Sequence, residues 1–531
     1  MKKNLLLSLV CSLMIIGISL KAEIIENYPA PETGKRLTPP IAEIPKINGA
    51  NVFAVKPGAE FVFRIPTSGI RPLNFKISGL PKGVKYDQKT GILSGTISKE
   101  GEFVISVTVR NSKGVAKKKI KIKCGGPLLA TPPMGWNSWY SYSEAVSQEG
   151  IEKMLKNMDA SGLADHGWSY VNIDDCWQGV RGGKYNAIQP NVRFPDMKKM
   201  CDYAHSLGLK IGIYSTPWMG TYAGFIGGSS PTENGDYSAK YIPSEKRGQE
   251  TQFFGTYPGT IRAGMNKVGQ YWMFDRDAKQ LSDWGFDYIK VDWQPNDEGN
   301  TKRMFDDLSK AKRGIVLSLS NAAPYKNMDG LVKYANVTRT TGDIHDSWGS
   351  IKNIGFSQEK WQKYLKVGHY PDPDMLQVGK IGQAGRRNTT FRPTKLKPDE
   401  QFTQISLWAL LSAPFLMSCD MGDLDDFTKG LLMNDEVIAI QQDAIASPAK
   451  RVYNAEGFQV WTKELENGDI SIGFFNLNDI KSILKINTEK LGLGNRTNVR
   501  DIWIQKDVGS LKNELSIQLN PHGVTLFRCR K

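Results

Sequence analysis

Residues 286–293 read Phe286-Asp-Tyr-Ile-Lys-Val-Asp-Trp293, an apolar, strand-like run that ends in a carboxylate. Similar runs recur between residues 131 and 443, separated by amphipathic, helix-like stretches at a spacing that suits βα units. Polar residues follow each run, where the carboxyl end of a strand would lie. The expected strands are residues 134–139, 170–176, 210–214, 288–293, 315–320, 337–341, 375–378 and 415–419. This pattern predicts a (β/α)8 TIM barrel over residues 130–443.

A doubly wound parallel sheet is the competing fold for alternating strands and helices. That fold normally carries a Gly-rich phosphate-binding loop directly after its first strand. Here the first strand leads into Gly135-Trp-Asn-Ser-Trp139, which has no such glycine pattern. The sequence therefore favours the barrel.

Both flanks of the barrel alternate polar and apolar residues, as half-buried strands do. A Pro-rich linker over residues 23–45 precedes short alternating runs that predict an immunoglobulin-like β-sandwich over residues 46–124. Alternation returns after the barrel and predicts a C-terminal antiparallel β-sandwich over residues 444–531. The chain of 531 residues is thus expected to be multidomain.

The first 22 residues resemble a secretory signal peptide. Lys2 and Lys3 precede an apolar run over residues 5–20, and Ala22 offers a small residue at the cleavage point. A signal anchor is the alternative. No later stretch approaches the roughly 20 apolar residues that a bilayer span needs, so we expect a secreted or periplasmic protein without a membrane span.

The formal net charge of +15 raises nucleic acid as a partner. The lysines are scattered, however, except for a group that alternates along one expected strand. A solvated edge strand explains this group better than a nucleic-acid surface, and an acidic or sulfated polysaccharide remains open as a partner. The group comprises Lys117, Lys118, Lys119, Lys121 and Lys123.

No cofactor or metal is expected. The five histidines are dispersed along the chain, and no carboxylate-rich calcium loop stands out. The cysteines that follow the signal segment form an odd set without the spacing of a disulfide scaffold or a zinc site.

Two aspartates at predicted strand ends are candidates for catalysis. Asp292 ends its apolar strand, and Lys290 lies two residues back on the same face, where its ammonium can keep the carboxylate ionised and donate to a hydroxyl. Asp343 follows another strand, with Asp346 as a rival acid. A buried ion pair and a helix N-cap remain open as purely structural explanations. Retaining cleavage of a glycosidic bond needs two such carboxyl groups roughly 5 Å apart.

Ordered motifs in the barrel region resemble glycoside hydrolase family 27. The resemblance extends from Thr131 to about Asp443 and implies a barrel with α-galactosidase or closely related activity and retention of configuration. The motifs are Met134-Gly-Trp-Asn-Ser-Trp139, Ile173-Asp-Asp-Cys-Trp177, Gly212-Ile-Tyr214, Tyr288-Ile-Lys-Val-Asp292, Asp343-Ile-x-Asp-Ser-Trp348 and Asp372-Pro-Asp-Met-Leu376.

The resemblance also implies roles for individual residues. Asp292 matches the nucleophile and Asp343 the acid/base, while Arg339 would hold the hydroxyls at C2 or C3 of the sugar. Asp174 and Asp175 match a clamp on the C4 and C6 hydroxyls. The remaining matches are Trp139 and Tyr214 on the apolar side of the sugar, and Asp372 and Asp374 as supports of the pocket floor.

The chain departs from the family pattern at three places. Ser320 and Ala323 stand where α-galactosidases carry a Glu and a bulky residue, and this small pair resembles the α-N-acetylgalactosaminidase branch. Trp293 follows the nucleophile in place of a Cys, and Cys176 lacks an evident mate, so two disulfides of the family are expected to be missing. Residues 216–274 form a long aromatic segment that could build extra sugar subsites or merely pack an insertion.

Several functions remain open on this scaffold. The main hypothesis is exo-hydrolysis of terminal α-D-galactosides in oligo- or polysaccharides. The alternatives are α-N-acetylgalactosaminidase, β-L-arabinopyranosidase, isomaltose-type α-glucosidase, or a non-catalytic glycan-binding protein.

Overall fold

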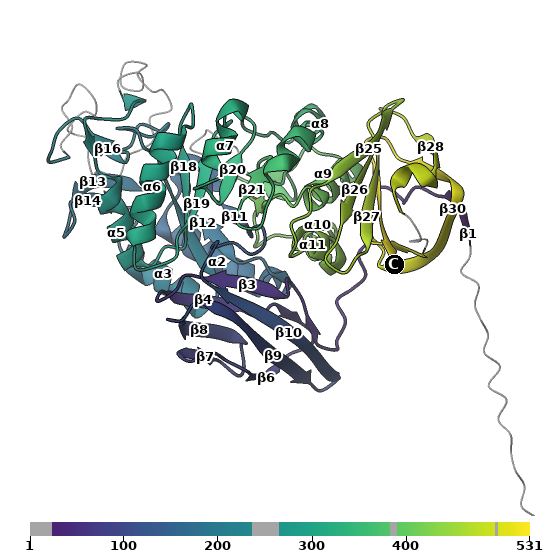
Figure 1. Ribbon diagram of the computed structural model, residues 1–531, viewed down its shortest axis with the longest axis horizontal. Coiled ribbons are helices and arrows are strands. Elements are labelled where there is room, and N and C mark those ends of the chain that lie inside the picture. Colours follow the sequence, from purple (N-terminus) through teal and green to yellow (C-terminus); the bar gives the residue numbers. More distant parts are fainter. Residues whose placement is uncertain (1–23, 236–264, 383–389, 494–497, 531) are drawn as a thin grey trace, which may run out of the picture.

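The computed structural model describes residues 24–235, 265–382, 390–493 and 498–530. A barrel occupies the centre of the molecule, a small β-sandwich lies below it, and a β-sheet domain lies on the right (Figure 1). This is the architecture that the sequence predicts. The signal segment lies outside the described residues.

Eight parallel strands form the barrel: the first seven pair with one another in chain order, and the eighth pairs with the first. A parallel bridge between Leu376 and Met417 joins the segment after the seventh strand to the eighth. The strands are β11 (Met134–Asn137), β12 (Tyr170–Asn172), β15 (Lys210–Ser215), β18 (Tyr288–Asp292), β19 (Val316–Ser320), β20 (Val337–Arg339), β21 (Tyr370–Asp372) and β24 (Phe415–Met417).

The seventh strand corrects the sequence prediction. The strand is β21 (Tyr370–Asp372), whereas the apolar run at residues 375–378 was expected to form it. Pro371 and Asp372 lower the strand propensity of the true segment, because proline cannot donate to a ladder. Burial inside the closing barrel outweighs that propensity, since all three residues of β21 are buried.

Helices surround the barrel, and several of them bury one apolar face, whereas α9 is buried along nearly its whole circumference. In α2 (Gln148–Ala160) the buried residues Ile151, Met154, Leu155 and Met158 follow the i, i+3, i+4, i+7 spacing of an amphipathic helix. Side-chain oxygens cap many of the N-termini, as Ser147 does for α2. The other helices are α1 (Trp139–Tyr142), α3 (Met197–Ser206), α5 (Phe274–Trp284), α6 (Glu298–Lys310), α7 (Met328–Leu331), α8 (Trp348–Gly355), α9 (Pro398–Leu410), α10 (Asp426–Leu432) and α11 (Asp435–Gln441).

Short strand pairs decorate the loops around the barrel. Each pair is antiparallel. They are β13 (Gln178–Gly182) with β14 (Ala187–Pro190), β16 (Ser229–Ser230) with β17 (Tyr271–Trp272), and β22 (Lys380–Ile381) with β23 (Arg392–Pro393).

The N-terminal sandwich packs two sheets around an apolar core that includes Phe75, Leu93 and Ile105. One sheet has the order β3-β10-β9-β6 and the other β4-β8-β7. The strands are β3 (Val52–Val55), β4 (Glu60–Arg64), β6 (Asn74–Ser78), β7 (Val84–Tyr86), β8 (Ile92–Thr96), β9 (Gly101–Asn111) and β10 (Gly114–Cys124), and a small pair, β2 (Lys46–Ile47) with β5 (Thr67–Ser68), flanks them.

The lysine-rich strand is an edge strand over part of its length. It is β10, which pairs with β9 throughout and with β3 only from Lys121 to Cys124. The Lys118 ammonium is largely buried and donates to the carbonyls of Asn48 (3.1 Å) and Gly49 (2.7 Å). Lys121 and Lys123 form ion pairs with Glu102 of β9. Cross-strand pairing and carbonyl contacts therefore account for part of this charge group.

The C-terminal domain is one sheet whose order is β1-β30-β29-β31-β27-β26-β25, with β28 also paired to β30. The first strand comes from the N-terminal segment predicted to be a linker, and it pairs with β30 in parallel. The strands are β1 (Ile24–Tyr28), β25 (Lys450–Ala455), β26 (Phe458–Glu464), β27 (Ile470–Asn476), β28 (Ser482–Asn487), β29 (Asn498–Asp501), β30 (Lys506–Leu519) and β31 (Val524–Arg530).

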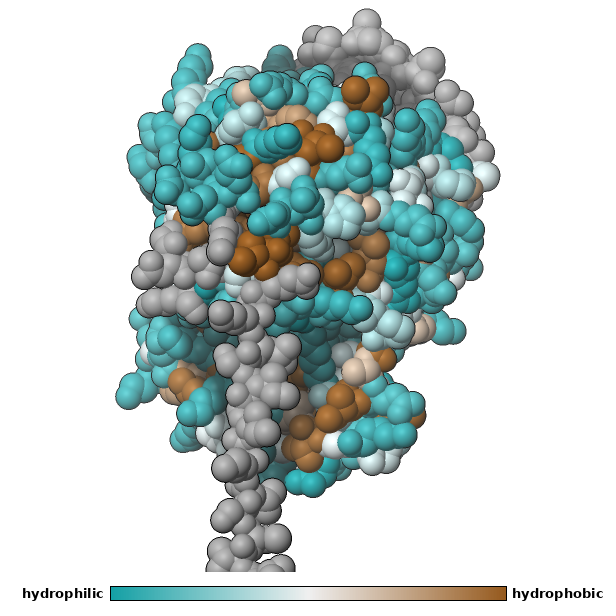
Figure 2. Space-filling model, turned by 90° about the vertical axis from the view of Figure 1, so that its right-hand side faces the viewer, coloured by the Kyte–Doolittle hydropathy of each residue, from teal (hydrophilic) through white to brown (hydrophobic). Residues whose placement is uncertain are grey.

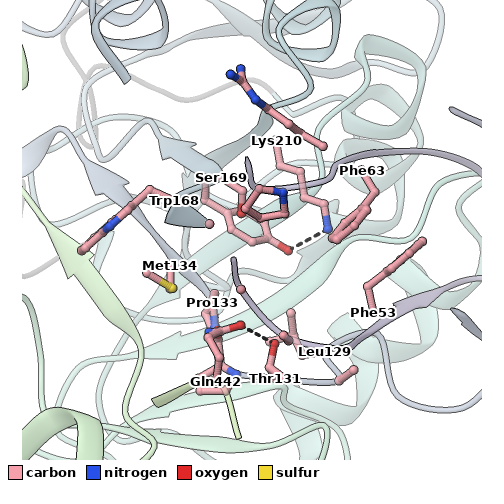
Figure 3. Close-up of a pocket in the computed structure, with 18 of the residues that line it drawn as sticks. Phe53, Phe63, Leu129, Thr131, Pro133, Met134, Trp168, Ser169, Lys210 and Gln442 are labelled. Atoms are coloured by element: carbon pink, nitrogen blue, oxygen red, sulfur yellow. Dashed lines mark hydrogen bonds between the residues drawn. The ribbon is translucent and has the colours of Figure 1, made fainter. Parts of the chain in front are cut away.

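The N-terminal sandwich docks on the end of the barrel where the strands begin. Arg64 of β4 forms ion pairs with Asp159 and Asp165, and the Lys56 ammonium donates to the carbonyls of Ser309 (2.7 Å) and Ala311 (2.5 Å). A space of about 800 Å³ remains between the two domains. Phe53 and Phe63 of the sandwich face Met134, Trp168 and Lys210 of the barrel across this space (Figure 3).

Hydrophilic side chains cover most of the molecular face on the C-terminal side, and apolar residues form separate patches there (Figure 2). Scattered exposed apolar residues are normal for a globular protein. Within the described residues, no helix is both long enough and apolar enough to cross a bilayer. The five cysteines in this part of the chain are all buried free thiols.

Candidate active site

A narrow cavity lies inside the barrel, lined by side chains from seven of its strands or the turns that follow them. Many of the lining groups are polar, and they include the predicted site residues Lys290, Ser320, Arg339 and Asp374. The space beneath the sandwich is larger, but it lies at the opposite ends of the strands and contains none of the predicted site residues. The full lining of the smaller cavity is Asn137, Asn172, Tyr288, Lys290, Ser318, Ser320, Arg339, Asp372, Asp374, Met375 and Leu416.

Asp292 is the last residue of β18 and pairs in register with Ser320 of β19. Its side chain is buried, and its Oδ1 has no hydrogen-bond partner among the described residues. The Tyr214 hydroxyl donates to Oδ2 over a long 3.4 Å. Burial raises the pKa of Asp292 to about 6, against the lowering effect of the Lys290 and Arg339 charges. The carboxyl is therefore held with one oxygen free for another partner.

Lys290 links Asp292 to Asp174. Its ammonium donates to Asp174 Oδ2 over 2.8 Å, and Asn137 Nδ2 donates to the same oxygen over 2.8 Å. Burial works against the charge on Lys290, but Asp174 and Asp292 override it and raise its pKa above the usual value. The negative charges beside Lys290 therefore favour its cationic form.

Arg339 organises the other side of the site. Its guanidinium pairs with Asp343 Oδ1 at 2.5 Å and with Asp374 Oδ1 at 3.0 Å, and it donates to Asn321 Oδ1 at 2.9 Å. The Asp343 side chain is 55% exposed, whereas that of Asp374 is buried. Burial opposes ionisation of Asp343, but Arg339 outweighs it and lowers the pKa of that carboxyl.

The rival acid Asp346 has a different task. Both of its oxygens accept from the Arg392 guanidinium, at 2.6 and 3.3 Å, and Lys395 N also donates to it at 2.9 Å. Arg392 and the Lys395 backbone lower its pKa, although burial works against them. Asp346 thus holds the segment around β23 and is not free for chemistry in the cavity.

Asp175 has different hydrogen-bond partners from its neighbour Asp174. Its Oδ1 accepts from Cys176 N at 2.7 Å, and its Oδ2 accepts from Ala223 N at 2.9 Å and interacts with the Thr221 side chain. Burial raises the pKa of Asp175 to about 7. One oxygen of Asp175 therefore accepts from its own turn and the other from the long loop after β15, and of the predicted clamp Asp174 is the residue that contacts Lys290.

The other predicted residues are distributed unevenly around the site. Tyr214 is buried, with the Lys290 ammonium 5.3 Å from its ring centroid. Ser320 is buried and lines the cavity, and its Oγ lacks a hydrogen-bond partner among the described residues. Ala323 is buried but only its backbone N contacts the site, by donating to Arg339 O. Trp139 is partly buried at the start of α1 and is not part of the cavity lining.

Asn137 and Asn172 also line the cavity, although neither was predicted from the sequence as a site residue. Asn172 is buried, and neither of its side-chain polar atoms has a hydrogen-bond partner in the described part of the chain. A signal was present, because Asn172 ends β12 two residues before Asp174 and so shares its face of the strand. An amide carries no charge, so a pattern of charged residues at strand ends does not indicate it.

The aromatic loop over residues 216–274 is described only in part. Trp218 and Tyr222 pack edge to face with ring centroids 5.3 Å apart, beside the Asp175 anchor. Trp272 donates its Nε1 to Asp307 and stacks on Arg303. These rings pack the loop against the barrel. The aromatic residues Tyr237, Tyr241, Phe253, Phe254 and Tyr257 lie outside the described residues.

The arrangement suits acid–base and nucleophilic chemistry on a polyhydroxylated ligand. Lys290 and Arg339 lower the pKa values of both Asp292 and Asp343, so the two carboxyls share one cationic environment. Asn172 and Ser320 line the polar cavity with unpartnered polar atoms. Asp292 is not among the lining residues, but it has an unpartnered oxygen and pairs in register with Ser320, and a sugar carries hydroxyls that could satisfy all three residues. Among the described residues, no three potential metal ligands cluster.

The chain is similar in sequence and in structure to known α-galactosidases and related proteins. The Coffea arabica α-galactosidase is 30% identical over 408 residues, covering 75% of this chain and 94% of that protein. The crystal structure of an α-galactosidase/melibiase candidate from Bacteroides fragilis NCTC 9343 is 27% identical with a TM-score of 0.79, covering 92% of this chain and 98% of that one. A GH27 β-L-arabinopyranosidase from Geobacillus stearothermophilus is 28% identical with a TM-score of 0.62, covering 76% and 97%.

Family models match all three regions of the chain. An Ig-domain model matches residues 45–123, and the α-galactosidase C-terminal β-sandwich model matches residues 455–529. The model described as α-galactosidase A matches residues 131–242 and 239–443, which include every strand of the barrel and every predicted site residue. The chain therefore belongs to the α-galactosidase family of glycoside hydrolases, family 27.

Proposed function

We propose that the chain is a retaining exo-α-galactosidase in which Asp292 is the nucleophile and Asp343 the acid/base. The observation that carries this assignment is the buried Asp292 carboxyl at the end of β18, whose Oδ1 has no hydrogen-bond partner among the described residues. A buried, half-satisfied carboxyl is costly to folding unless function uses it. The family membership and the polar cavity next to it support a terminal galactose as the bound sugar.

In the first step the ionised Asp292 attacks the anomeric carbon of the α-galactoside. The bond between that carbon and the leaving oxygen breaks, and Asp343 gives its proton to this oxygen. A covalent β-galactosyl ester on Asp292 results. Lys290 and Arg339 favour the ionised nucleophile because both lower the pKa of Asp292.

In the second step a water molecule attacks the anomeric carbon from the face that the leaving group has vacated. Asp343, now a carboxylate, takes a proton from this water, and the ester bond to Asp292 breaks. The product is α-galactose, and both carboxyls return to their starting states. The Arg339–Asp343 ion pair supports this step, because it favours the carboxylate form of Asp343.

The remaining polar groups suit recognition of sugar hydroxyls. Asp174 accepts charge-assisted hydrogen bonds and already receives Lys290 and Asn137, which orient it toward the site. Arg339 is anchored by Asp374 from behind. We assign Asp174, Lys290 and Arg339 to sugar hydroxyls, Tyr214 to the support of Asp292, and Asp175 and Asp374 to positioning.

The stereochemistry of the first product tests the proposal. ¹H NMR of an α-galactoside digest should show α-galactose first, followed by mutarotation. Asp292→Gly should lose hydrolysis and form β-galactosyl azide from an activated α-galactoside when azide is added. A first product with β configuration would refute retention, and the absence of turnover on every α-glycoside would favour the non-catalytic glycan-binding alternative.

A second candidate activity is α-N-acetylgalactosaminidase. Its support is Ser320, a small buried residue that lines the cavity with an unpartnered Oγ and leaves room beside Arg339. Ser320→Glu should lower the ratio of activity on 4-nitrophenyl α-N-acetylgalactosaminide to activity on the α-galactoside, because the carboxylate fills the acetamido space. Ser318→Ala is the matched control, because Ser318 lies two residues before Ser320 on the same face of β19. An unchanged ratio in Ser320→Glu would discard this candidate.

We also propose that residues 1–22 direct export, so that the enzyme acts outside the cytoplasm on oligo- or polysaccharides. The basic start, the apolar run and Ala22 support this proposal. Expression of the full chain in a bacterial host, followed by fractionation and N-terminal sequencing, should yield a shortened protein outside the cytoplasm. An intact N-terminus in the cytoplasmic fraction would contradict it.

A further inference from the structure

The backbone that carries Asp343 has few ties of its own. Residues 341–347 connect β20 to α8 as an irregular segment. Within the described part of the chain, the peptide groups of Gly342 and Asp343 make no hydrogen bond, and the space around Gly342 is open. A carboxyl on such a segment depends on neighbouring anchors for its position.

The main anchor is the next residue, Ile344, which is fully buried. Its backbone N donates to Asp374 Oδ2 at 2.9 Å, and its carbonyl accepts the Tyr140 hydroxyl at 2.6 Å. Both sides of this residue are therefore fixed, one by a carboxylate and the other by a phenol. A weaker tie follows at His345, whose N donates to Ser350 Oγ at 2.9 Å.

Tyr140 is itself held rigidly. It belongs to α1, whose first residue, Trp139, donates its N to Asn137 Oδ1 at 2.9 Å. The next residue, Ser141, donates its Oγ to Ser418 O at 2.7 Å. The tyrosine ring is buried between these anchored neighbours. The loop after the first barrel strand thus holds the loop after the sixth strand through one hydroxyl.

The electrostatic surroundings make that hydroxyl a permanent donor. Burial raises the pKa of Tyr140 well above its ordinary value, and the negative charges of Asp374 and Asp343 raise it further. The phenol therefore stays protonated throughout the pH range in which a glycosidase works. Ile344 joins the hydroxyl to the Asp374 carboxylate, because its carbonyl accepts from Tyr140 and its N donates to Asp374.

From this geometry we infer that Tyr140 is a positioning residue for the acid/base carboxyl: by holding the Ile344 carbonyl, it fixes Asp343 for proton transfer to the leaving oxygen. The inference rests on the proposed role of Asp343. Tyr140 does not touch the sugar in this scheme. Its loss should therefore slow only those reactions that need the proton.

Two substrates separate this effect from a general loss of activity. Melibiose releases a sugar hydroxyl that must be protonated, whereas α-galactosyl fluoride releases fluoride, which needs little assistance from an acid. Misplacing a general acid removes part of a 10²- to 10⁴-fold contribution to rate. Tyr140→Phe should therefore lower kcat/KM for melibiose by about 10- to 100-fold and leave kcat/KM for the fluoride within about twofold.

Tyr142→Phe is the matched control, because it removes a hydroxyl from the same helix. The Tyr142 ring packs edge-on against Trp136 and Phe391, and no hydrogen bond between Tyr142 and Ile344 is found among the described residues. This variant should treat both substrates as the wild type does. If Tyr140→Phe does not fold, Tyr140→Met removes the hydroxyl with a flexible side chain of similar reach, and the same two substrates are compared.

A double-mutant cycle tests whether the effect passes through Asp343. Asp343→Ala should itself lower kcat/KM for melibiose far more than for the fluoride, and adding Tyr140→Phe should then cost nothing further on melibiose. Equal losses on both substrates in Tyr140→Phe, or additive losses in the double variant, would overturn the positioning role alone. Equal losses in Asp343→Ala would instead refute the acid role of Asp343, and the role of Tyr140 with it.

Discussion

The two ends of the barrel use the same strands for opposite purposes. At the end where the strands finish, Asp292 is buried with one oxygen unpartnered, and Asn172 and Ser320 add further unsatisfied polar atoms. At the end where the strands begin, Asp287 is equally buried, but it receives Arg313 Nε at 2.8 Å and lies 2.9 Å from His205 Nε2. The end with Asp292 therefore has polar atoms without hydrogen-bond partners, which a ligand could bind. At the other end the Asp287 carboxylate has its partners within the protein.

The pKa values express the same contrast. Burial raises the pKa of Asp292 to about 6, since the cations around it compensate only in part. Burial also disfavours the charge on Asp287, but His205 and Arg313 outweigh it and lower its pKa well below the usual value. The difference teaches that burial alone does not mark a functional carboxylate in this fold. A buried carboxylate that lacks hydrogen-bond partners is the better indicator of function.

The N-terminal sandwich strengthens this division of labour. It covers the end of the barrel that carries Asp287 and contributes Arg64 and Lys56 to that interface (Figure 1). The larger space between these domains is lined by groups that bond to one another, such as Thr131 and Gln442 at 2.7 Å (Figure 3). The larger space therefore lies at the end of the barrel that the sandwich supports, and none of the predicted site residues lines it.

The sharpest way to break the comparison is Asp292→Asn. We expect kcat on an α-galactoside to fall by on the order of 10⁴-fold, because the amide cannot form the ester. We also expect Tm at pH 7 to rise. The pKa of Asp292 is higher in the folded than in the unfolded protein, so above the unfolded pKa this carboxyl lowers the free energy of unfolding, by up to about 3 kcal/mol. Steady-state kinetics and thermal unfolding check both. A lower Tm would contradict the idea that this site costs stability.

The mirror-image change is Asp287→Asn at the opposite end. Removing the charge leaves Arg313 and His205 uncompensated and should lower the free energy of unfolding by about 3 kcal/mol, with kcat unchanged in the folded protein. Because the folded pKa of Asp287 is lowered, this loss should be present above pH about 4 and shrink as the pH falls. Denaturant unfolding at several pH values measures it.

Asp306→Asn is the control for Asp287→Asn. Asp306 pairs with Lys302 on the exposed face of α6, and such pairs contribute about 0.5 kcal/mol or less. A stability loss as small as this in Asp287→Asn would remove the contrast between the two ends.

The pH dependence of kcat/KM gives a smaller effect that sharpens the comparison. The reactive state needs one proton shared between Asp292 and Asp343, and the upper of the two pKa values is that of Asp292, about 6. Activity should therefore fall about tenfold per pH unit above pH 6, as the second carboxyl ionises. In Asp292→Asn, the free energy of unfolding should show no change of slope near pH 6, because the titrating carboxyl is gone. A plateau of kcat/KM up to pH 8 would place the proton elsewhere.

Much of the fold could be predicted because local patterns carry it. Apolar runs ending in polar residues indicated most of the barrel strands, and alternation indicated both β domains. β21 escaped because Pro371 and Asp372 oppose strand formation locally, and only burial in the closed barrel favours it. The pairing of β1 with β30 joins residues more than 480 positions apart, and no local pattern reports such a contact.

The site divides in the same way. Asp292 and Asp343 are indicated by their places at the ends of predicted strands, and Lys290 by its spacing to Asp292. Arg339 and the role of Asp174 were predicted from the family resemblance. The separation of Asp175 from Asp174 does not follow, since it depends on the backbone of Ala223 reaching back to the carboxylate. The engagement of Asp346 by Arg392 is equally non-local.

By itself, the sequence determined the type of each domain and which acidic side chains stand at the ends of strands, because strand periodicity and residue chemistry are local properties. Only the tertiary structure decided which of those side chains remain unsatisfied, which are neutralised by a partner, and which hydroxyl holds the segment of Asp343. Hydrogen bonds between distant loops make that decision, and their existence depends on how the closed barrel brings the loops together.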